Sequence, residues 1–413
     1  MEWVYLDNNA TTRPAAAVVA AMAEAHERFW ANPSSVHRLG QMVRQRLDEA
    51  RASVAGLIGA QGREMIFTSG GTEANNLALR GLLTPMPPDG PPPVLLTSGI
   101  EHSAIREPAE DLEQAGVQVR WLEVGAHGLI APAALAAALE EVLARPRPVV
   151  VSIQWANNET GVIQPVAALA ERVAAARQGL RQAGARGAGV YFHVDATQAV
   201  GKIPVDVAAA GVDLLTLAGH KFHGPKGVGA LWVRRTVRLR PQQRGGPQER
   251  DRRGGTENTA GIIGLGVAAE LAGAFLADEA AAAELAALRD RFEQAILAQV
   301  DDAVVHGRGV ERLWNTTNIA FPGLEAEAIL LSLSEQGVCA SAGAACSSGS
   351  LEPSPVLLAM GVAEAVAHGS VRFSLSRQTT QAKVDAAAAV VVEAVGRLRQ
   401  TLPLAPGAEQ RKI

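Results

Sequence analysis

The chain has 413 residues, of which 48% are hydrophobic and 19% are charged, as is usual for a globular protein with a large core and more than one domain. Its net charge of −4 at pH 7 gives no electrostatic support for nucleic acid or an anionic membrane as the main partner. Two cysteines are too few for a disulfide framework and favour a reducing compartment.

The N-terminal residues, MEWVYLDNNATT, lack the basic region and the apolar run of a signal peptide. The apolar runs near 149–155 and 386–392 are too short to span a bilayer. We therefore expect a cytoplasmic protein with no membrane partner.

In chain order, a short strand at 3–6 and helices at 15–29 and 35–59 precede a series of seven predicted strands. Helical segments, among them 132–144 and 165–183, separate several of these strands, which is typical of a mostly parallel sheet covered on both faces. The last two strands are joined too tightly for a helix, so this pair is expected to be antiparallel. The seven strands are 65–68, 94–98, 117–124, 148–156, 190–194, 213–218 and 228–233.

Beyond residue 260 the pattern changes and predicts a second, smaller α+β unit. Its predicted elements are helices within 262–300, strands near 303, at 316–321 and at 370–375, and a C-terminal helix at 381–401. The fold class is therefore α/β, with a large domain at 14–260 and a small domain at 261–413 that residues 1–13 complete.

Polar residues follow several predicted strands at the point where each strand ends. Asp195 ends one strand, and Lys221 comes just after the next. Ligands of α/β sheets bind at the carboxyl ends of the strands. A lysine there can form a Schiff base with pyridoxal phosphate, and a carboxylate can pair with the ring nitrogen of that cofactor. Other polar residues near strand ends are Thr72, His102, Asn158, Gln198 and His220.

Two of these features have alternative interpretations. Lys226, in the turn GPKG, competes with Lys221 as the Schiff-base lysine, but Lys221 follows its strand directly. The glycine turn SGGTE opens a helix with Gly71 and Thr72, where backbone N–H groups and the helix N-terminus could hold a phosphate. A plain strand-to-helix turn is the alternative. No lysine of the Walker type follows, which argues against a nucleoside triphosphate site.

The two cysteines differ in their surroundings. Cys346 lies in a segment of small residues, ASAGAACSSGSLEPS, which would leave its thiol accessible as a nucleophile, whereas composition alone favours a small apolar side chain that fills space. Cys339 follows an apolar run and is expected to be buried. The histidines and cysteines show no spacing of the kind that zinc sites use, so we expect no metal.

Ten motifs, in order along nearly the whole chain, resemble those of the cysteine desulfurases of the NifS and IscS type, which are pyridoxal-phosphate-dependent enzymes of the class V aminotransferase family. The motifs are YLDNNATT, NPSSVH, FTSGGTEANNLA, EHSAI, NNETG, HVDATQAVGK, GHKFHGPKG, GGTEN, SLEPS and VRFSLSR. The resemblance implies a homodimer with the type I fold of pyridoxal-phosphate-dependent transferases. It also implies conversion of L-cysteine to L-alanine, with the sulfur held as a persulfide on Cys346 and passed to an acceptor such as an iron–sulfur assembly scaffold.

The resemblance implies a role for each matching residue. Lys221 matches the lysine that binds the cofactor covalently, Cys346 the sulfur nucleophile, and His102 the histidine that stacks on the ring and moves protons. Asp195 and Gln198 match the partners of the ring nitrogen and the ring oxygen.

Further matches concern the ring oxygen and the phosphate. Asn158 matches a second contact to the ring oxygen, and Thr72 and His220 match phosphate ligands. Thr256, in GGTEN, matches a threonine that reaches the phosphate from the other subunit.

Arg372 and Asn32 match groups that bind the substrate carboxylate, a task that suits the fork of a guanidinium. Two residues depart from the family pattern. Ala218 stands where a serine often contacts the phosphate, and Ala344 replaces the serine of the usual GSAC sequence. We expect a lower cofactor affinity from the first change and retained activity despite the second, because the thiol is kept.

Other functions are compatible with many of the same residues. A selenocysteine lyase or an aminotransferase would share the fold, and an inert scaffold for sulfur-transfer partners is an alternative from another class. The intact set of Lys221, His102 and Cys346 argues against the scaffold. The sulfur acceptor stays open among nitrogenase clusters, general iron–sulfur assembly and transfer-RNA thiolation.

Overall fold

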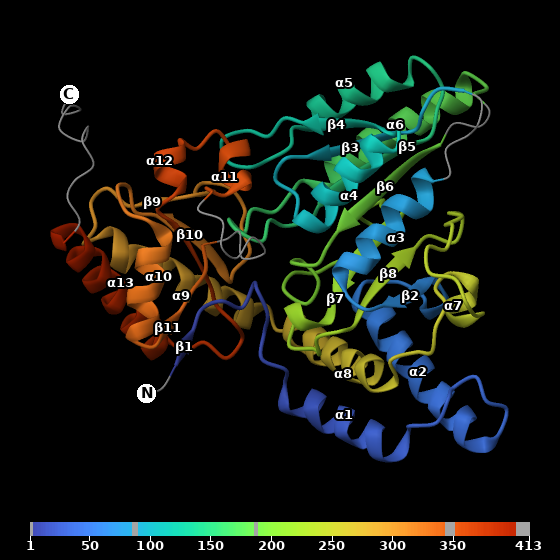
Figure 1. The fold of residues 1–413 in the computed structure, drawn as a ribbon, viewed down its shortest axis with the longest axis horizontal. Coiled ribbons are helices and arrows are strands. Elements are labelled where there is room, and N and C mark those ends of the chain that lie inside the picture. The colour runs from blue at the N-terminus through green and yellow to red at the C-terminus, as the bar shows by residue number, and fades with distance from the viewer. Residues whose placement is uncertain (1–2, 85–89, 186–188, 343–351, 402–413) are drawn as a thin grey trace.

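The computed structural model describes residues 3–84, 90–185, 189–342 and 352–401, which form a large and a small unit (Figure 1). The large unit is built on a seven-stranded sheet with the order β2-β8-β7-β6-β5-β3-β4. Strand β8 is antiparallel to both of its neighbours, and the other pairs are parallel. The mostly parallel sheet and the antiparallel last pair are therefore confirmed. The strands are β2 (Met65–Thr68), β3 (Val94–Ser98), β4 (Gln118–Leu122), β5 (Val149–Gln154), β6 (Val190–Asp195), β7 (Leu214–Ala218) and β8 (Gly229–Val233).

Helices cover both faces of this sheet because its strands are apolar on both sides. Leu95 and Val150 pack against α3 (Gly71–Leu83) and α4 (Ser103–Gln114). Their sequence neighbours point to the opposite face and belong to the largest core cluster. The helices that contribute to that cluster are α1 (Ala16–Arg28), α2 (Arg38–Leu57), α5 (Pro132–Leu143), α6 (Val166–Gln182) and α8 (Thr259–Leu276).

Helix α8 is long and apolar enough to cross a membrane by composition alone, and more than half of its residues are buried inside the protein. Its residues from Ala260 to Ala272 share a core cluster with α1 and α2, beside which it lies in Figure 1. A core helix of a large unit accounts for this composition. Residues of α8 therefore contribute to the core of the large unit, and residues of α9 (Glu279–Leu297) contribute to a separate core cluster.

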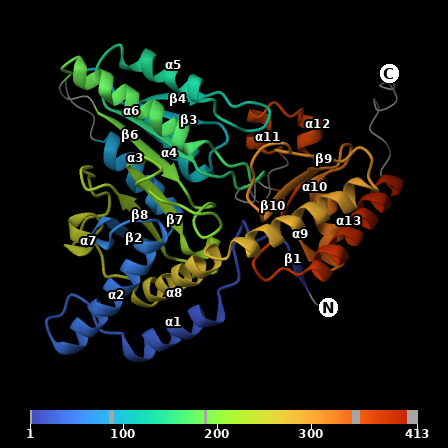
Figure 2. The ribbon, with the colours of Figure 1, turned by 180° about the vertical axis from the view of Figure 1, so that it is seen from behind.

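The small unit combines two short sheets with helices. Its antiparallel sheet has the order β12-β10-β9, and β1 pairs in parallel with β11. Figure 2 shows α9 and α13 side by side along the outside of this unit. The elements are β1 (Val4–Tyr5), α9 (Glu279–Leu297), β9 (Val304–Val305), β10 (Thr316–Ala320), α10 (Ala326–Glu335), β11 (Val338–Cys339), α11 (Pro355–Ala359), α12 (Glu364–Ala367), β12 (Ser370–Ser374) and α13 (Gln381–Thr401).

The N-terminal segment joins the two units. After β1, the backbone N–H of Asn8 donates to the carbonyl of Ser374 at 3.2 Å, in the small unit. Four residues later, the N–H of Thr12 donates to the carbonyl of His220 at 2.8 Å, in the large unit. The intervening residues therefore lie across the junction, beside the carboxyl ends of the central strands.

Candidate active site

Most of the predicted site residues line one cavity of about 260 Å³ at the carboxyl ends of β6 and β7. Its position agrees with the rule that parallel sheets bind ligands at this edge. The predicted residues on its wall are Gly71, Thr72, His102, Asn158, Asp195, Gln198, His220 and Lys221.

Asp195 ends β6 and is 6% exposed. Its Oδ2 accepts a hydrogen bond from Asn75 Nδ2 at 2.8 Å, and its Oδ1 accepts one from the backbone N–H of Thr197 at 3.0 Å. These donors fix the carboxylate at one end of the cavity. Two residues earlier on the same strand face, burial lowers the pKa of His193 to about 4, so this histidine is a neutral support at pH 7.

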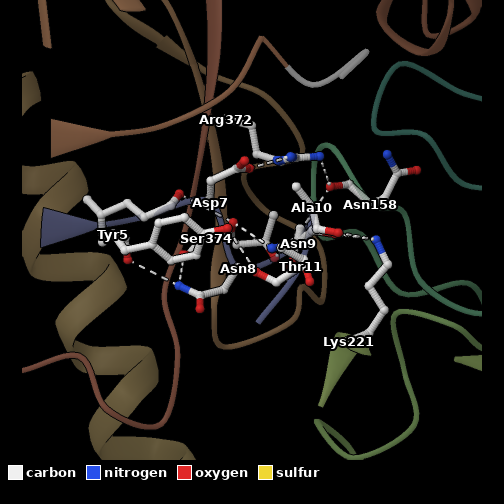
Figure 3. A network of polar contacts seen from close by, with 12 residues as sticks. Tyr5, Asp7, Asn8, Asn9, Ala10, Thr11, Asn158, Lys221, Arg372 and Ser374 are labelled. Atoms are coloured by element: carbon white, nitrogen blue, oxygen red, sulfur yellow. Dashed lines mark hydrogen bonds and ion pairs between the residues drawn. The ribbon is translucent and has the colours of Figure 1, made fainter. Parts of the chain in front are cut away.

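Lys221 ends a single 3-10 turn, Gly219–Lys221, that follows β7 directly. Its Nζ donates to the backbone carbonyls of Asn9 at 2.6 Å and Ala10 at 3.0 Å (Figure 3). Lys226 is exposed and does not line this cavity. The geometry therefore favours Lys221 as the lysine that reacts with a cofactor.

The glycine turn before α3 lies against β8 with no room for a side chain at Gly229. A Cβ atom there would come within 2.7 Å of the backbone carbon of Gly70. Gly71 and Thr72 open the helix and present its N-terminus to the cavity, which favours an anion. Ala218 forms the neighbouring wall and carries no hydroxyl.

Two histidines, His102 and His220, lie on the wall of the cavity. Burial, followed by the nearby Lys221, Lys226 and Lys202, lowers the pKa of His220 to about 4, so at pH 7 it is a neutral hydrogen-bonding group. His102 caps α4, and its Nδ1 accepts the N–H of Ala104 at 3.0 Å. Because Nδ1 is an acceptor, the neutral ring carries its proton on Nε2.

Asn9 is a buried hub of the site that the sequence did not single out. Its side chain receives hydrogen bonds from Lys202 and Asn315, and its Nδ2 donates to the carbonyl of Asn158 at 3.0 Å. Its backbone carbonyl accepts from Lys221 and from Gln198. In the sequence, the only indication of this role is the pair of asparagines in the polar segment YLDNNATT.

Arg372 lies on β12 of the small unit and is 2% exposed. It pairs with Asp7 at 2.7 Å and donates to the carbonyl of Asn158 at 3.1 Å, as Figure 3 shows. The guanidinium is therefore held beside the cavity without lining it. Its predicted role in binding the substrate carboxylate stays a prediction.

The remaining predicted residues lie elsewhere. Asn32 and Thr256 are exposed and do not line the cavity of their own chain; the Oδ1 of Asn32 accepts the N–H of Ser34 at 2.8 Å. Cys346 and Ala344 lie outside the described residues. Cys339 is partly buried, and burial raises the pKa of its thiol.

The groups on the cavity wall fit pyridoxal phosphate. The fixed carboxylate of Asp195 suits a ring nitrogen, the amine of Lys221 an aldehyde, the amide of Gln198 a ring oxygen, and the start of α3 a phosphate. Two buried oxygens on the wall, Asn75 Oδ1 and Thr197 Oγ1, have no hydrogen-bond partner within the described residues. The fold and the cavity together define a pyridoxal-phosphate-dependent enzyme of fold type I.

Comparisons with known proteins agree with this class. The family described as Aminotransferase class-V matches residues 4–387. The chain is 48% identical over 403 residues to "Cysteine desulfurase 2" of Trichormus variabilis, covering 98% of this chain and 96% of the relative. A solved "NIFS-LIKE PROTEIN" is 32% identical with a TM-score of 0.85, covering 96% of this chain and all of the other. A structure described as "SspA in complex with cysteine" is 33% identical with a TM-score of 0.74, covering 91% and 99%. The chain belongs to the class V aminotransferase family, among the cysteine desulfurases of the NifS and IscS type.

Proposed function

We propose that this protein converts L-cysteine to L-alanine and retains the sulfur as a persulfide on Cys346 for transfer to an acceptor. The observation that carries the proposal is the single cavity in which Lys221 Nζ, the carboxylate of Asp195 and the glycine turn before α3 come together. The relative named cysteine desulfurase and the structural neighbour with bound cysteine support the choice of substrate.

The residues of the cavity have distinct tasks in this reaction. Bound pyridoxal phosphate supplies the electron sink for the α-carbon of the substrate. Asp195, held by two hydrogen bonds, would pair with the ring nitrogen and favour its protonated form. Lys221 Nζ takes the α-proton, and the carbonyls of Asn9 and Ala10 can accept hydrogen bonds from the resulting ammonium. His102 offers a second proton at Nε2.

The substrate carboxylate is assigned to Arg372, with Asn32 as a second candidate. Asp7 pairs with the guanidinium, so that Arg372 is oriented before substrate arrives. In the proposed cycle the Cys346 thiolate attacks the substrate sulfur, the bond from that sulfur to the β-carbon breaks, and alanine leaves after protonation.

The proposal extends to a cytoplasmic homodimer that hands its sulfur to an acceptor protein, such as a scaffold for iron–sulfur clusters. The exposed position of Thr256, away from the cavity of its own chain, supports a role toward a second copy.

The test measures alanine formed from L-cysteine by the purified protein, together with its visible spectrum. Lys221→Ala is expected to lose turnover and the visible band of the bound cofactor, and Cys346→Ala is expected to lose alanine formation while keeping the band. Lys226→Ala and Cys339→Ala are the matched controls and should keep both. Undiminished alanine release by Cys346→Ala would refute its role as nucleophile, and activity confined to selenocysteine would favour the lyase.

A further inference from the structure

Lys202 is a buried lysine that has no task in the mechanism described above. It lies four residues beyond Gln198, in the turns that follow β6, and is 4% exposed. Its Nζ donates to Gln198 Oε1 at 2.5 Å and to Asn9 Oδ1 at 2.9 Å. Burial, then Lys221 and Arg372, lower the pKa of Lys202 well below its ordinary value. Burying a lysine costs free energy, and the partners of Lys202 are two amide oxygens rather than a carboxylate. Its position therefore needs a functional or structural reason.

The contacts of Gln198 give its amide one orientation. Its Nε2 donates to the backbone carbonyl of Asn9 at 3.0 Å, while its Oε1 accepts from Lys202. A backbone carbonyl can only accept, so the reverse orientation would place Oε1 of Gln198 against the carbonyl oxygen of Asn9, where no hydrogen bond could form. One N–H of Nε2 is used by Asn9. Since Gln198 lines the cavity, the second N–H is the group that it can offer there.

We propose that Lys202 is a positioning residue that holds and polarises the amide of Gln198, so that Gln198 presents an N–H donor to the ring oxygen of pyridoxal phosphate. The inference rests on the proposed function, because it requires that cofactor in this cavity. A hydrogen bond accepted at Oε1 strengthens the one donated from Nε2. A stronger donor stabilises the ionised ring oxygen, so Lys202 lowers the pKa that controls the visible absorption of the bound cofactor.

Other charged and titratable groups face the same region and must stay constant in the test. On the cavity wall and behind Asn9 they are His102, Asp195, His220, Lys221, Asp7 and Arg372. None of them is changed in the variants below, so a difference between variants reports on Lys202 and Gln198.

The experiment titrates the visible absorption of the cofactor-loaded protein against pH. Lys202→Met removes the donor with little change in volume, and we expect the pKa of the absorption change to rise by about one unit, a tenfold shift in the proton equilibrium. The same substitution in a Gln198→Leu background should shift the pKa by less than about 0.3 unit, because coupled groups show non-additive effects. Lys226→Met, which removes an exposed charge that Gln198 does not contact, should give no shift.

Two results would overturn the inference. The first is an unchanged pKa in Lys202→Met. The second is the same shift with and without Gln198, since Lys202 would then act on the cofactor through its charge alone. If Lys202→Met does not yield folded protein, Lys202→Gln, which keeps a donor group but carries no charge, is titrated alone and in the Gln198→Leu background instead. It should shift the pKa of the absorption change in the same direction, but by less. A wild-type protein without a visible band would refute the cofactor assignment itself. That result differs from the two above, in which the band is present but Lys202 does not act through Gln198.

Discussion

At the scale of single residues, the site divides into groups that the sequence predicts and groups that only packing reveals. Asp195, Lys221 and His102 could be found because each follows an apolar run that ends at the ligand-binding edge of a sheet. Asn9 and Lys202 could not, since their importance depends on hydrogen bonds between segments far apart in the chain. Composition gives no sign that a lysine is buried, because most lysines are exposed.

Glu101, next to His102, is a buried acid whose charge state links folding to pH. The residue is 1% exposed, and its Oε1 accepts from Ser98 Oγ at 2.7 Å. Burial raises its pKa from 4.5 to about 8, and the Asp195 carboxylate adds to the rise. Between these two values the folded protein keeps a proton that the unfolded chain has released, so stability falls as pH increases through this window.

Glu101→Gln is therefore expected to reduce the loss of stability that accompanies the rise in pH, because glutamine does not ionise. The melting temperatures of the two cofactor-loaded proteins are compared between pH 5 and pH 8. The melting temperature of the variant relative to that of the wild type should increase as the pH rises. Glu140→Gln, at an exposed position on α5, is the control and should stay at a constant difference. A constant difference for Glu101→Gln as well would contradict the assignment.

At the scale of elements, the strands of the large sheet were predictable because buried parallel strands are short, continuous apolar runs. Helix α4 was not predicted, and its sequence SAIREPAEDLEQ shows why. Pro108 lies inside the helix, where proline normally interrupts helical periodicity, and the start of the helix depends on the side chain of His102 rather than on a serine or aspartate cap.

The short helix α7 (Gln248–Asp251) contains three successive non-glycine residues with left-handed backbone angles, Glu249, Arg250 and Asp251, at φ 46°, 57° and 59°. Such a conformation costs about 1–2 kcal/mol for each residue. A buried ion pair offsets that cost: Arg51 donates to both carboxylate oxygens of Glu249 at 2.6 and 2.7 Å. The same carboxylate accepts the N–H of Phe67 on β2. This pair therefore fixes the start of the loop that leads to Thr256.

Glu249→Gln is expected to destabilise the protein by about 3–5 kcal/mol, because it leaves the guanidinium of Arg51 buried without its counter-charge. Denaturant unfolding of the cofactor-free protein measures this loss. The exposed pair of Arg291 and Asp385 supplies the control, since Asp385→Asn should leave the unfolding midpoint unchanged. Equal effects of the two substitutions would mean that the α7 pair contributes no more than a surface contact.

At the scale of the whole molecule, the two cores are separate, but the site needs both. Lys221 and Asp195 come from the large unit and Arg372 from the small one, and Asn9 connects them. The loop that carries Thr256 is tied to the large unit by Arg253, which pairs with Glu73 in the first turn of α3 at 2.8 Å. Thr256 itself lies outside its own cavity, which is the geometry expected of a residue that serves a second copy.

A homodimer is therefore expected, with twice the chain mass of 43.0 kDa in sedimentation, and Thr256→Ala should weaken cofactor binding about tenfold. Mixed dimers test whether Thr256 acts across the interface. One chain carries Thr256→Ala and the other Lys221→Ala, so a complete site arises only if the threonine comes from the other chain. Mixed dimers that bind cofactor no better than the Thr256→Ala protein would place its action within one chain.

The path of the N-terminal segment has a consequence for how the protein is made. Asp7 and Asn9 find their partners, Arg372 and Ser374, 365 residues further along. Until β12 has been synthesised, Asp7 and the backbone N–H of Asn9 lack these partners, whereas Thr12 can already dock on His220 in the large unit. The junction between the two units should therefore form only when synthesis is nearly complete, so that chains stalled before β12 would leave the N-terminal segment attached to the large unit alone.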